Sequence, residues 1–203
     1  VFMLRNPIDR TFSQYMMARK NFLETESFET ALSLEEKRSR EGEFRRKNNG
    51  YLQRGFYAEQ VKRFLEYFPK EQMHFIIFET EFIPKRAETI QDLCQFLGVS
   101  SYNFDLDIQK NVMRDPGSAT LHRILHDPGF AWMRKPFKLL IPSPKVRERI
   151  KAKVRWWQGK KISDKKSLTM DDSIREELLE KFRDDILELQ KLIGKDLTHW
   201  LKV

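Results

Sequence analysis

An arginine and a serine eight positions apart, Arg5 and Ser13, bracket the segment of this sequence that is best suited to chemistry. Arg5 follows a short apolar run that is typical of the end of a buried strand. Asn6 and Pro7 have the residue types of a helix N-cap and a first helical residue, so a helix is expected directly after Arg5. A guanidinium at a strand end, a helix start with unpaired N–H groups and a hydroxyl together suit a dianionic phosphate. The alternative is that Arg5 pairs with Asp9 and that Ser13 is merely exposed.

A second candidate region is the strongly basic stretch between residues 134 and 166. It holds 13 lysines and arginines against two acidic residues, Glu148 and Asp164, whereas the whole chain of 203 residues has a net charge of +8. Positive charge concentrated in this way suits a nucleotide, a sulfated or phosphorylated ligand, nucleic acid or a membrane surface. The alternative is a solvated helix face. The candidates for contact with an anionic cofactor or acceptor here are Lys160, Lys161, Lys165 and Lys166.

Other kinds of site have little support. The single cysteine, Cys94, excludes a disulfide framework and lies on the apolar face of its expected helix, so we expect a buried, inert thiol. His122 and His126 share a helix face, but no third ligand completes a zinc site. The sequence has no Gly-x-Ser-x-Gly elbow, no Gly-x-x-x-x-Gly-Lys loop and no apolar run of about 18 residues. We therefore expect neither a metal nor a membrane span.

The elements that position the first segment alternate between strand and helix. A continuous apolar run, Met73–Phe78, predicts a second strand that is covered on both faces. Helical periodicity predicts helices over residues 57–68, ended by Pro69, and over residues 87–97, ended by Gly98. This order of elements predicts an α/β fold with a parallel sheet in which the first and second strands lie side by side or nearly so. Residues 24–50 are polar and predict a short helix from about Ser33, followed by an exposed loop.

The part of the chain beyond residue 100 is expected to be helix-rich. Short stripes of apolar residues predict helices over residues 121–125 and 145–157. A long amphipathic helix is predicted from Ser173, which has capping-box spacing to Glu176, and Gly194 closes it. Trp200 and Leu201 are expected to fold back onto the body of the domain.

The motif Arg-Asn-Pro-x-Asp-Arg-x-x-Ser-x-Tyr over residues 5–15 resembles the 3′-phosphate-binding motif of sulfotransferases that use 3′-phosphoadenosine 5′-phosphosulfate (PAPS). In that family the arginine and the serine hold the 3′-phosphate, which implies this role for Arg5 and Ser13. The similarity is to bacterial and heparan-sulfate-type enzymes and covers most of the chain. It continues through Arg54-Gly55-Phe56-Tyr57, Phe68-Pro69, Phe78-Glu79, Phe96-Leu97-Gly98-Val99, Asn111, Leu140-Ile141-Pro142, Arg175-Glu176-Glu177-Leu178, Leu192-Ile193-Gly194 and Asp196-Leu197-x-x-Trp200.

The resemblance implies a P-loop-like three-layer fold, with a parallel sheet between flanking helices and a helix-rich C-terminal half. In the family a Pro-Lys-x-Gly-Thr-type loop, which holds the 5′-phosphosulfate, and the catalytic base, a Glu or His, precede the Arg-x-Pro segment. Neither is found in residues 1–203. We therefore interpret residues 1–203 as a single, partial domain without the phosphosulfate loop, with the catalytic base expected upstream of Val1. This chain alone is expected to be inactive.

The activity implied for the intact protein is transfer of a sulfuryl group from PAPS to a hydroxyl or amine of a carbohydrate or small molecule. Arg10 is a weaker candidate for the site and is expected to pair with a nearby carboxylate. Tyr57 either lines the cleft or packs in the core. The expected location is the cytoplasm, or the Golgi lumen for a eukaryotic enzyme with an upstream anchor, and no nucleic acid partner is expected.

Two other classes of function stay open at this point. Another P-loop-type phosphoryl-transfer enzyme needs a Walker lysine and a magnesium-binding Asp at a strand end, but Phe78 is followed by Glu79. A basic module that binds anions or nucleic acid would use residues 134–166, and its affinity would fall steeply with salt.

Overall fold

The computed structural model describes residues 1–21, 23–100, 102, 104, 106, 146, 149 and 170–202. Within these residues the chain forms two compact units, one from residues 1–14, 50–100 and 170–202 and the other from residues 15–21 and 23–49. The first unit contains the sheet and four of the predicted site residues, Arg5, Arg10, Ser13 and Tyr57. The predicted helices over residues 121–125 and 145–157, the histidine pair and the four lysines lie outside the described residues, apart from two isolated positions.

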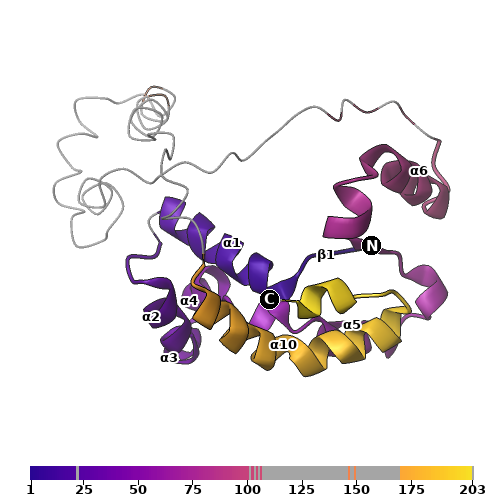
Figure 1. Ribbon diagram of the computed structural model, residues 1–203. Helices are drawn as coiled ribbons and strands as arrows, with labels where there is room; N and C mark the ends of the chain where they lie inside the picture. The colour runs from indigo at the N-terminus through magenta and orange to yellow at the C-terminus, as the bar shows by residue number, and fades with distance from the viewer. Residues whose placement is uncertain are drawn as a thin grey trace. The chain divides into compact units, whose positions relative to one another are not determined.

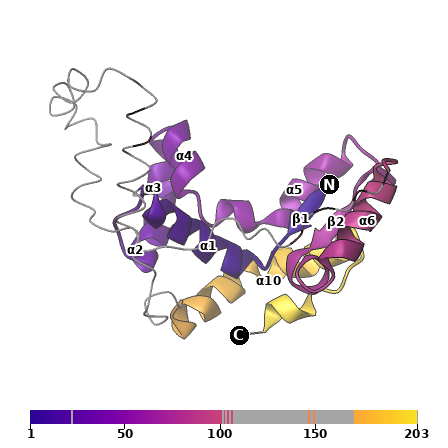
Figure 2. The ribbon, with the colours of Figure 1, turned by 90° about the horizontal axis from the view of Figure 1, so that it is seen from above.

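A two-stranded parallel sheet forms the centre of the first unit, as predicted. Strand β1, Phe2–Leu4, pairs with β2, Phe75–Ile77, in the register Phe2 with Phe75 through Leu4 with Ile77. The two strands lie side by side in Figure 2. All three residues of β2 are buried, which agrees with the expectation that an unbroken apolar run marks a strand covered on both faces. Both strands end at the same edge of the sheet, where Arg5 and Phe78 follow.

Helix α1, Pro7–Lys20, begins where the sequence predicts. The side-chain oxygen of Asn6 accepts a hydrogen bond from the backbone N–H of Ile8 at 2.9 Å, so Asn6 caps the helix. Pro7 has no N–H to satisfy, which suits the first helical position. Ile8 and Thr11 are fully buried and anchor one side of the helix.

Helix α5, Tyr57–Leu65, packs along helix α10, Asp172–Ile193 (Figure 1). The carboxylate of Asp185 on α10 accepts hydrogen bonds from the N–H groups of Tyr57 (2.8 Å) and Ala58 (3.1 Å). A side chain 128 residues further along the chain therefore caps the start of α5. Desolvation by burial raises the pKa of Asp185, against the lowering effect of these backbone donors.

Two boundaries of the predicted helices are wrong. Helix α5 ends at Leu65, before Phe68, and a short 3₁₀ turn over Lys70–Gln72 separates it from β2. Phe64 is about half exposed (48%), so the predicted apolar stripe of α5 is only partly buried. Helix α10 is capped by Asp171, whose side chain accepts from the N–H of Ser173, and not by Ser173. The end of α10 at Gly194 is as predicted, with φ at +71°.

The second unit corrects the prediction for residues 24–50. Three short helices occupy this segment: α2, Phe28–Ser33, α3, Glu35–Arg40, and α4, Glu43–Asn49. A polar pair lies beside the buried Phe28 and Ala31 here, because Glu24 is 4% exposed and pairs with Arg38 at 2.5 Å. Residues 24–50 are polar in composition and nevertheless pack into helices, and the part predicted to be an exposed loop is helical.

The first unit also contains two elements that follow β2 directly and one that follows α10. A single π-helical turn, η3, spans Phe78–Phe82, and helix α6, Arg86–Phe96, ends before Gly98 at φ +65°. Cys94 on α6 is buried, as predicted. After α10, the 3₁₀ turn η6, Thr198–Leu201, brings Trp200 into a fully buried position, and Leu201 is partly buried. In the described part of the chain, no helix is long and apolar enough to cross a membrane.

Candidate functional site

The site lies at the carboxyl edge of the two-stranded sheet, where β1 ends and α1 begins shortly afterwards. Arg5 is the first residue after β1, and its guanidinium lies over the ring of Phe78, 5.4 Å from the ring centroid. Phe78 is in turn the first residue after β2. Since parallel strands bring their carboxyl ends to one edge, the strand ends alone place a cation on an aromatic face.

The guanidinium of Arg5 is available for a ligand. It takes part in no hydrogen bond or ion pair with any other residue that the structure describes. The alternative in which Arg5 pairs with Asp9 is wrong, because Asp9 pairs with Arg175 of α10 at 2.6 Å. An arginine that is held by stacking and keeps its five N–H donors suits an anion with several oxygens.

Ser13 lies on α1 about two turns beyond the strand end, on the side opposite the buried Ile8 and Thr11. Its hydroxyl has no hydrogen-bond partner among the residues described. No hydrogen bond joins Ser13 to Arg5 among the described residues, and neither side chain hydrogen-bonds to another of them.

The start of α1 contributes fewer free donors than the sequence suggested. The N–H of Asn6 donates to Oε1 of Glu79 at 2.8 Å, and the N–H of Ile8 donates to the side chain of Asn6. Pro7 has no N–H. The positive end of the helix dipole remains, but the N–H groups of Asn6 and Ile8 are both engaged within the protein.

Arg10 and Tyr57 lie close to this edge but are engaged in the fold. Arg10 donates to the carbonyl oxygen of Tyr51 at 2.8 Å and to the side-chain oxygen of Gln14. Both of these acceptors are neutral. The ring of Tyr57 packs 6.3 Å from that of Trp200, which favours the core-packing interpretation of Tyr57.

The phenol of Tyr57 brings Arg5 and Arg10 into one electrostatic neighbourhood. Burial raises the pKa of Tyr57 to about 12, against the opposing effects of the Arg10 charge and of a backbone hydrogen bond from Arg5. The phenol is therefore neutral at physiological pH and serves as a fixed polar contact to the backbone of Arg5.

This pKa predicts how stability depends on alkaline pH. A raised pKa in the folded state stabilises the fold fully below the unfolded value near 10, and this stabilisation is lost as pH rises towards 12. The loss through this window should approach roughly 2 kcal/mol. Urea unfolding at several pH values should therefore show a steeper alkaline decline for the unmodified chain than for Tyr57→Phe. Spectrophotometric titration of the unmodified chain and of Tyr57→Phe isolates the ionisation of the Tyr57 phenol as the difference between the two curves. If that difference shows ionisation near pH 10, the assigned environment is contradicted.

Two residues beside the site, Glu79 and Asp185, were not predicted from the sequence as site residues. Glu79 accepts from the N–H of Asn6 and from the indole N–H of Trp200, and Asp185 caps the helix that carries Tyr57. The position of Glu79 directly after the apolar run was a usable signal, since it places a carboxylate at the carboxyl edge of the sheet. Asp185 had none, because its partner lies 128 residues away.

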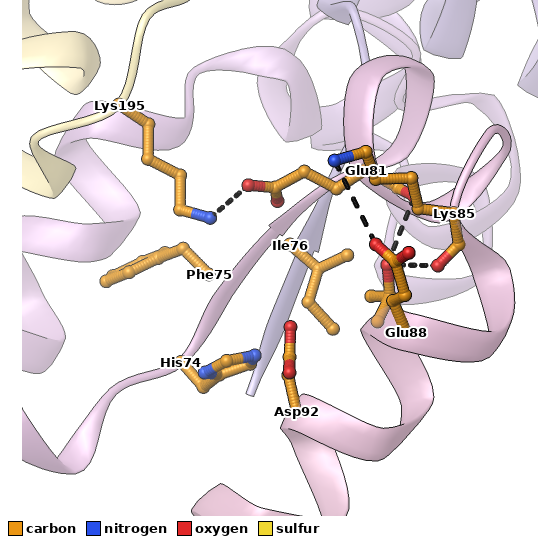
Figure 3. A pocket seen from close by; sticks show the side chains of 9 residues that line it. His74, Phe75, Ile76, Glu81, Lys85, Glu88, Asp92 and Lys195 are labelled. Atoms are coloured by element: carbon orange, nitrogen blue, oxygen red, sulfur yellow. Dashed lines mark hydrogen bonds and ion pairs between the residues drawn. The ribbon is translucent and has the colours of Figure 1, made fainter.

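A pocket of about 190 Å³ lies beside β2 and α6 (Figure 3). Neither Glu79 nor Asp185 lines it. His74, Phe75 and Ile76 form one wall, and Glu81 and Lys195, which pair at 2.5 Å, lie at another. It contains none of the predicted site residues. Among the residues described, no group of three or more His, Cys, Asp or Glu side chains is placed to hold a metal ion.

Comparison with known proteins identifies the family. Residues 1–135 match the sulfotransferase domain family. The crystal structure of a sulfotransferase from Alicyclobacillus acidocaldarius is similar to this chain, with 29% sequence identity and a TM-score of 0.63. The match covers 98% of this chain and 56% of that chain, so this chain spans little more than half the length of that sulfotransferase. No curated protein matches the chain. The family match spans most of the sequence and includes the Arg5–Ser13 segment, and the chain belongs to the sulfotransferase domain family.

Proposed function

We propose that this sulfotransferase domain binds the donor PAPS by its 3′-phosphate, through Arg5 and Ser13. The observation that carries the proposal is the guanidinium of Arg5 at the carboxyl end of β1, which has no ion-pair partner among the described residues. The unengaged hydroxyl of Ser13 on the following helix is the second donor. A phosphate dianion offers three oxygens to a planar guanidinium and a hydroxyl, and the positive end of α1 adds to the attraction.

The reaction that we propose for the protein is sulfuryl transfer to a hydroxyl or amine of a carbohydrate or small molecule. The acceptor atom bonds to sulfur while the bond from sulfur to the 5′-phosphate oxygen breaks, and the acceptor proton passes to a base. Because the family's phosphosulfate loop is not found among residues 1–203, we expect these residues to bind the 3′-phosphate end of the donor without catalysing transfer by themselves. We further propose that the sheet belongs to a P-loop-like three-layer fold.

The other residues predicted to contact the cofactor or acceptor fall into two groups. Tyr57 acts through the backbone of Arg5, and Arg10 through α1 and Tyr51. Lys160, Lys161, Lys165 and Lys166 stay predictions for contact with cofactor or acceptor, because they lie outside the described residues.

The test is a binding comparison between two nucleotides that differ only in the 3′-phosphate. We expect 3′-phosphoadenosine 5′-phosphate to bind the 203-residue chain at least tenfold more tightly than adenosine 5′-phosphate, the scale of a charge-assisted hydrogen bond. Isothermal titration or chemical-shift titration measures both affinities. Equal affinity for the two nucleotides would refute the assigned 3′-phosphate site.

A further inference from the structure

Glu79 joins two parts of the first unit that are far apart in sequence. One carboxylate oxygen, Oε1, accepts the backbone N–H of Asn6 at 2.8 Å. The other, Oε2, accepts the indole N–H of Trp200 at 3.2 Å. Asn6 is 6% exposed and Trp200 is fully buried, so both donors are shielded from water, whereas Glu79 itself is partly exposed. The carboxylate is thus shared between the residue after Arg5 and the C-terminal turn η6.

The neighbour of Glu79 in sequence acts on the same arginine. Phe78 provides the ring beneath the guanidinium of Arg5, while Glu79 holds the peptide that follows Arg5. The phenol of Tyr57, which packs on the ring of Trp200, receives the backbone hydrogen bond from Arg5 itself. The side chain and the backbone of Arg5 are therefore fixed from η3, and Trp200 supports both Glu79 and Tyr57.

We infer that Glu79 is a positioning residue for the phosphate-binding arginine, and that it couples Arg5 to the C-terminal Trp200. The inference rests on the proposed function, because it assumes that Arg5 holds the 3′-phosphate. Glu79 touches no ligand in this role. It fixes the direction in which the chain leaves β1, and hence the direction of the Arg5 side chain. A planar guanidinium binds a phosphate well only in a narrow range of orientations, so a small rotation of this peptide weakens binding.

A neighbouring carboxylate offers a matched control. Glu81, two residues further along η3, accepts from Lys195 at 2.5 Å and from the N–H of Ile77 at 2.7 Å. The Glu81–Lys195 pair also ties the C-terminal segment to η3 (Figure 3), and neither residue hydrogen-bonds to Arg5 or Asn6 in the described part of the chain. Lys195→Met therefore removes a tether of the same segment without touching Asn6.

The experiment compares Glu79→Gln, Lys195→Met and the unmodified chain in binding both nucleotides. Glutamine has the same size, but its NH₂ group takes the place of one of the two accepting oxygens and would face an N–H donor. We expect Glu79→Gln to bind 3′-phosphoadenosine 5′-phosphate about tenfold more weakly, with its affinity for adenosine 5′-phosphate unchanged. Lys195→Met should bind both nucleotides like the unmodified chain. A loss that is equal for both nucleotides would indicate a merely structural role and would overturn the inference.

A second measurement needs no variant. Because coupling is reciprocal, saturating 3′-phosphoadenosine 5′-phosphate should slow hydrogen exchange of the Trp200 indole N–H in the unmodified chain, and adenosine 5′-phosphate should not. Exchange unchanged by the bound nucleotide would overturn the coupling even if Glu79→Gln fails to fold. The two proposals fail differently. If the unmodified chain does not prefer the 3′-phosphorylated nucleotide, the proposed function falls and this inference with it. If it does, and Glu79→Gln keeps that preference, only this inference falls.

Discussion

Replacement of Arg5 by alanine is expected to weaken binding of 3′-phosphoadenosine 5′-phosphate by roughly 10- to 150-fold, which corresponds to about 1.5–3 kcal/mol. The reason is the shortage of other donors at this edge of the sheet. The N–H groups of Asn6 and Ile8 are engaged within the protein, and Pro7 has none. If the 3′-phosphate binds here as proposed, the guanidinium should supply most of its hydrogen bonds, and isothermal titration measures their loss directly.

Two further variants separate the role of Arg5 from a general effect of charge. Arg5→Lys keeps the charge but loses the planar fork, so an intermediate affinity is expected. Arg63→Ala removes a positive charge from the exposed side of α5, where Arg63 pairs with Glu59, and should leave the affinity unchanged. Unaltered affinity in Arg5→Ala, or an equal loss in Arg63→Ala, would show that the phosphate binds elsewhere.

The parts of the fold that could be predicted from the sequence are those set by local patterns. The apolar runs at residues 1–4 and 73–78 contain both strands, and their pairing was correctly predicted. Asn6 and Pro7 marked the start of α1, and Gly98 and Gly194 marked two helix ends, because each of these residues satisfies a requirement of backbone geometry at its own position.

The parts that could not be predicted depend on partners that are distant in sequence. The start of α5 is capped by Asp185, and the turn after Arg5 is held by Glu79. Within residues 24–50, the buried Glu24 pairs with Arg38, which lies 14 residues further along the chain, and no local pattern indicates this pair. For the candidate site, the sequence indicated Arg5 and Ser13, but only the structure showed that Asp9 is neutralised by Arg175, which leaves Arg5 unpaired among the described residues.

Gly55→Ala is expected to cost about 3 kcal/mol of stability, because there is no room for a methyl group at this position. A Cβ at Gly55 would lie 2.7 Å from two ring atoms of Phe182 and 3.3 Å from Cβ of Pro7. Phe182 is fully buried on α10 and packs on the ring of Phe56, with 4.9 Å between the centroids, so it cannot move aside cheaply. Overpacking of a rigid core typically costs about 1–3 kcal/mol, and contact with both a ring and the start of α1 places this site at the upper end.

A double-mutant cycle tests the cause of that cost. Leucine at position 182 removes the ring atoms that the new methyl group would meet, so Phe182→Leu should relieve part of the strain. We expect Gly55→Ala with Phe182→Leu to lose less stability than the sum of the two single variants, with a coupling of about 1–2 kcal/mol in urea unfolding. Strictly additive losses would mean that the methyl group is excluded by something other than Phe182. Because Pro7 closes the other side of Gly55, the single variant should also displace the start of α1 and weaken nucleotide binding, and the double variant should recover part of that affinity.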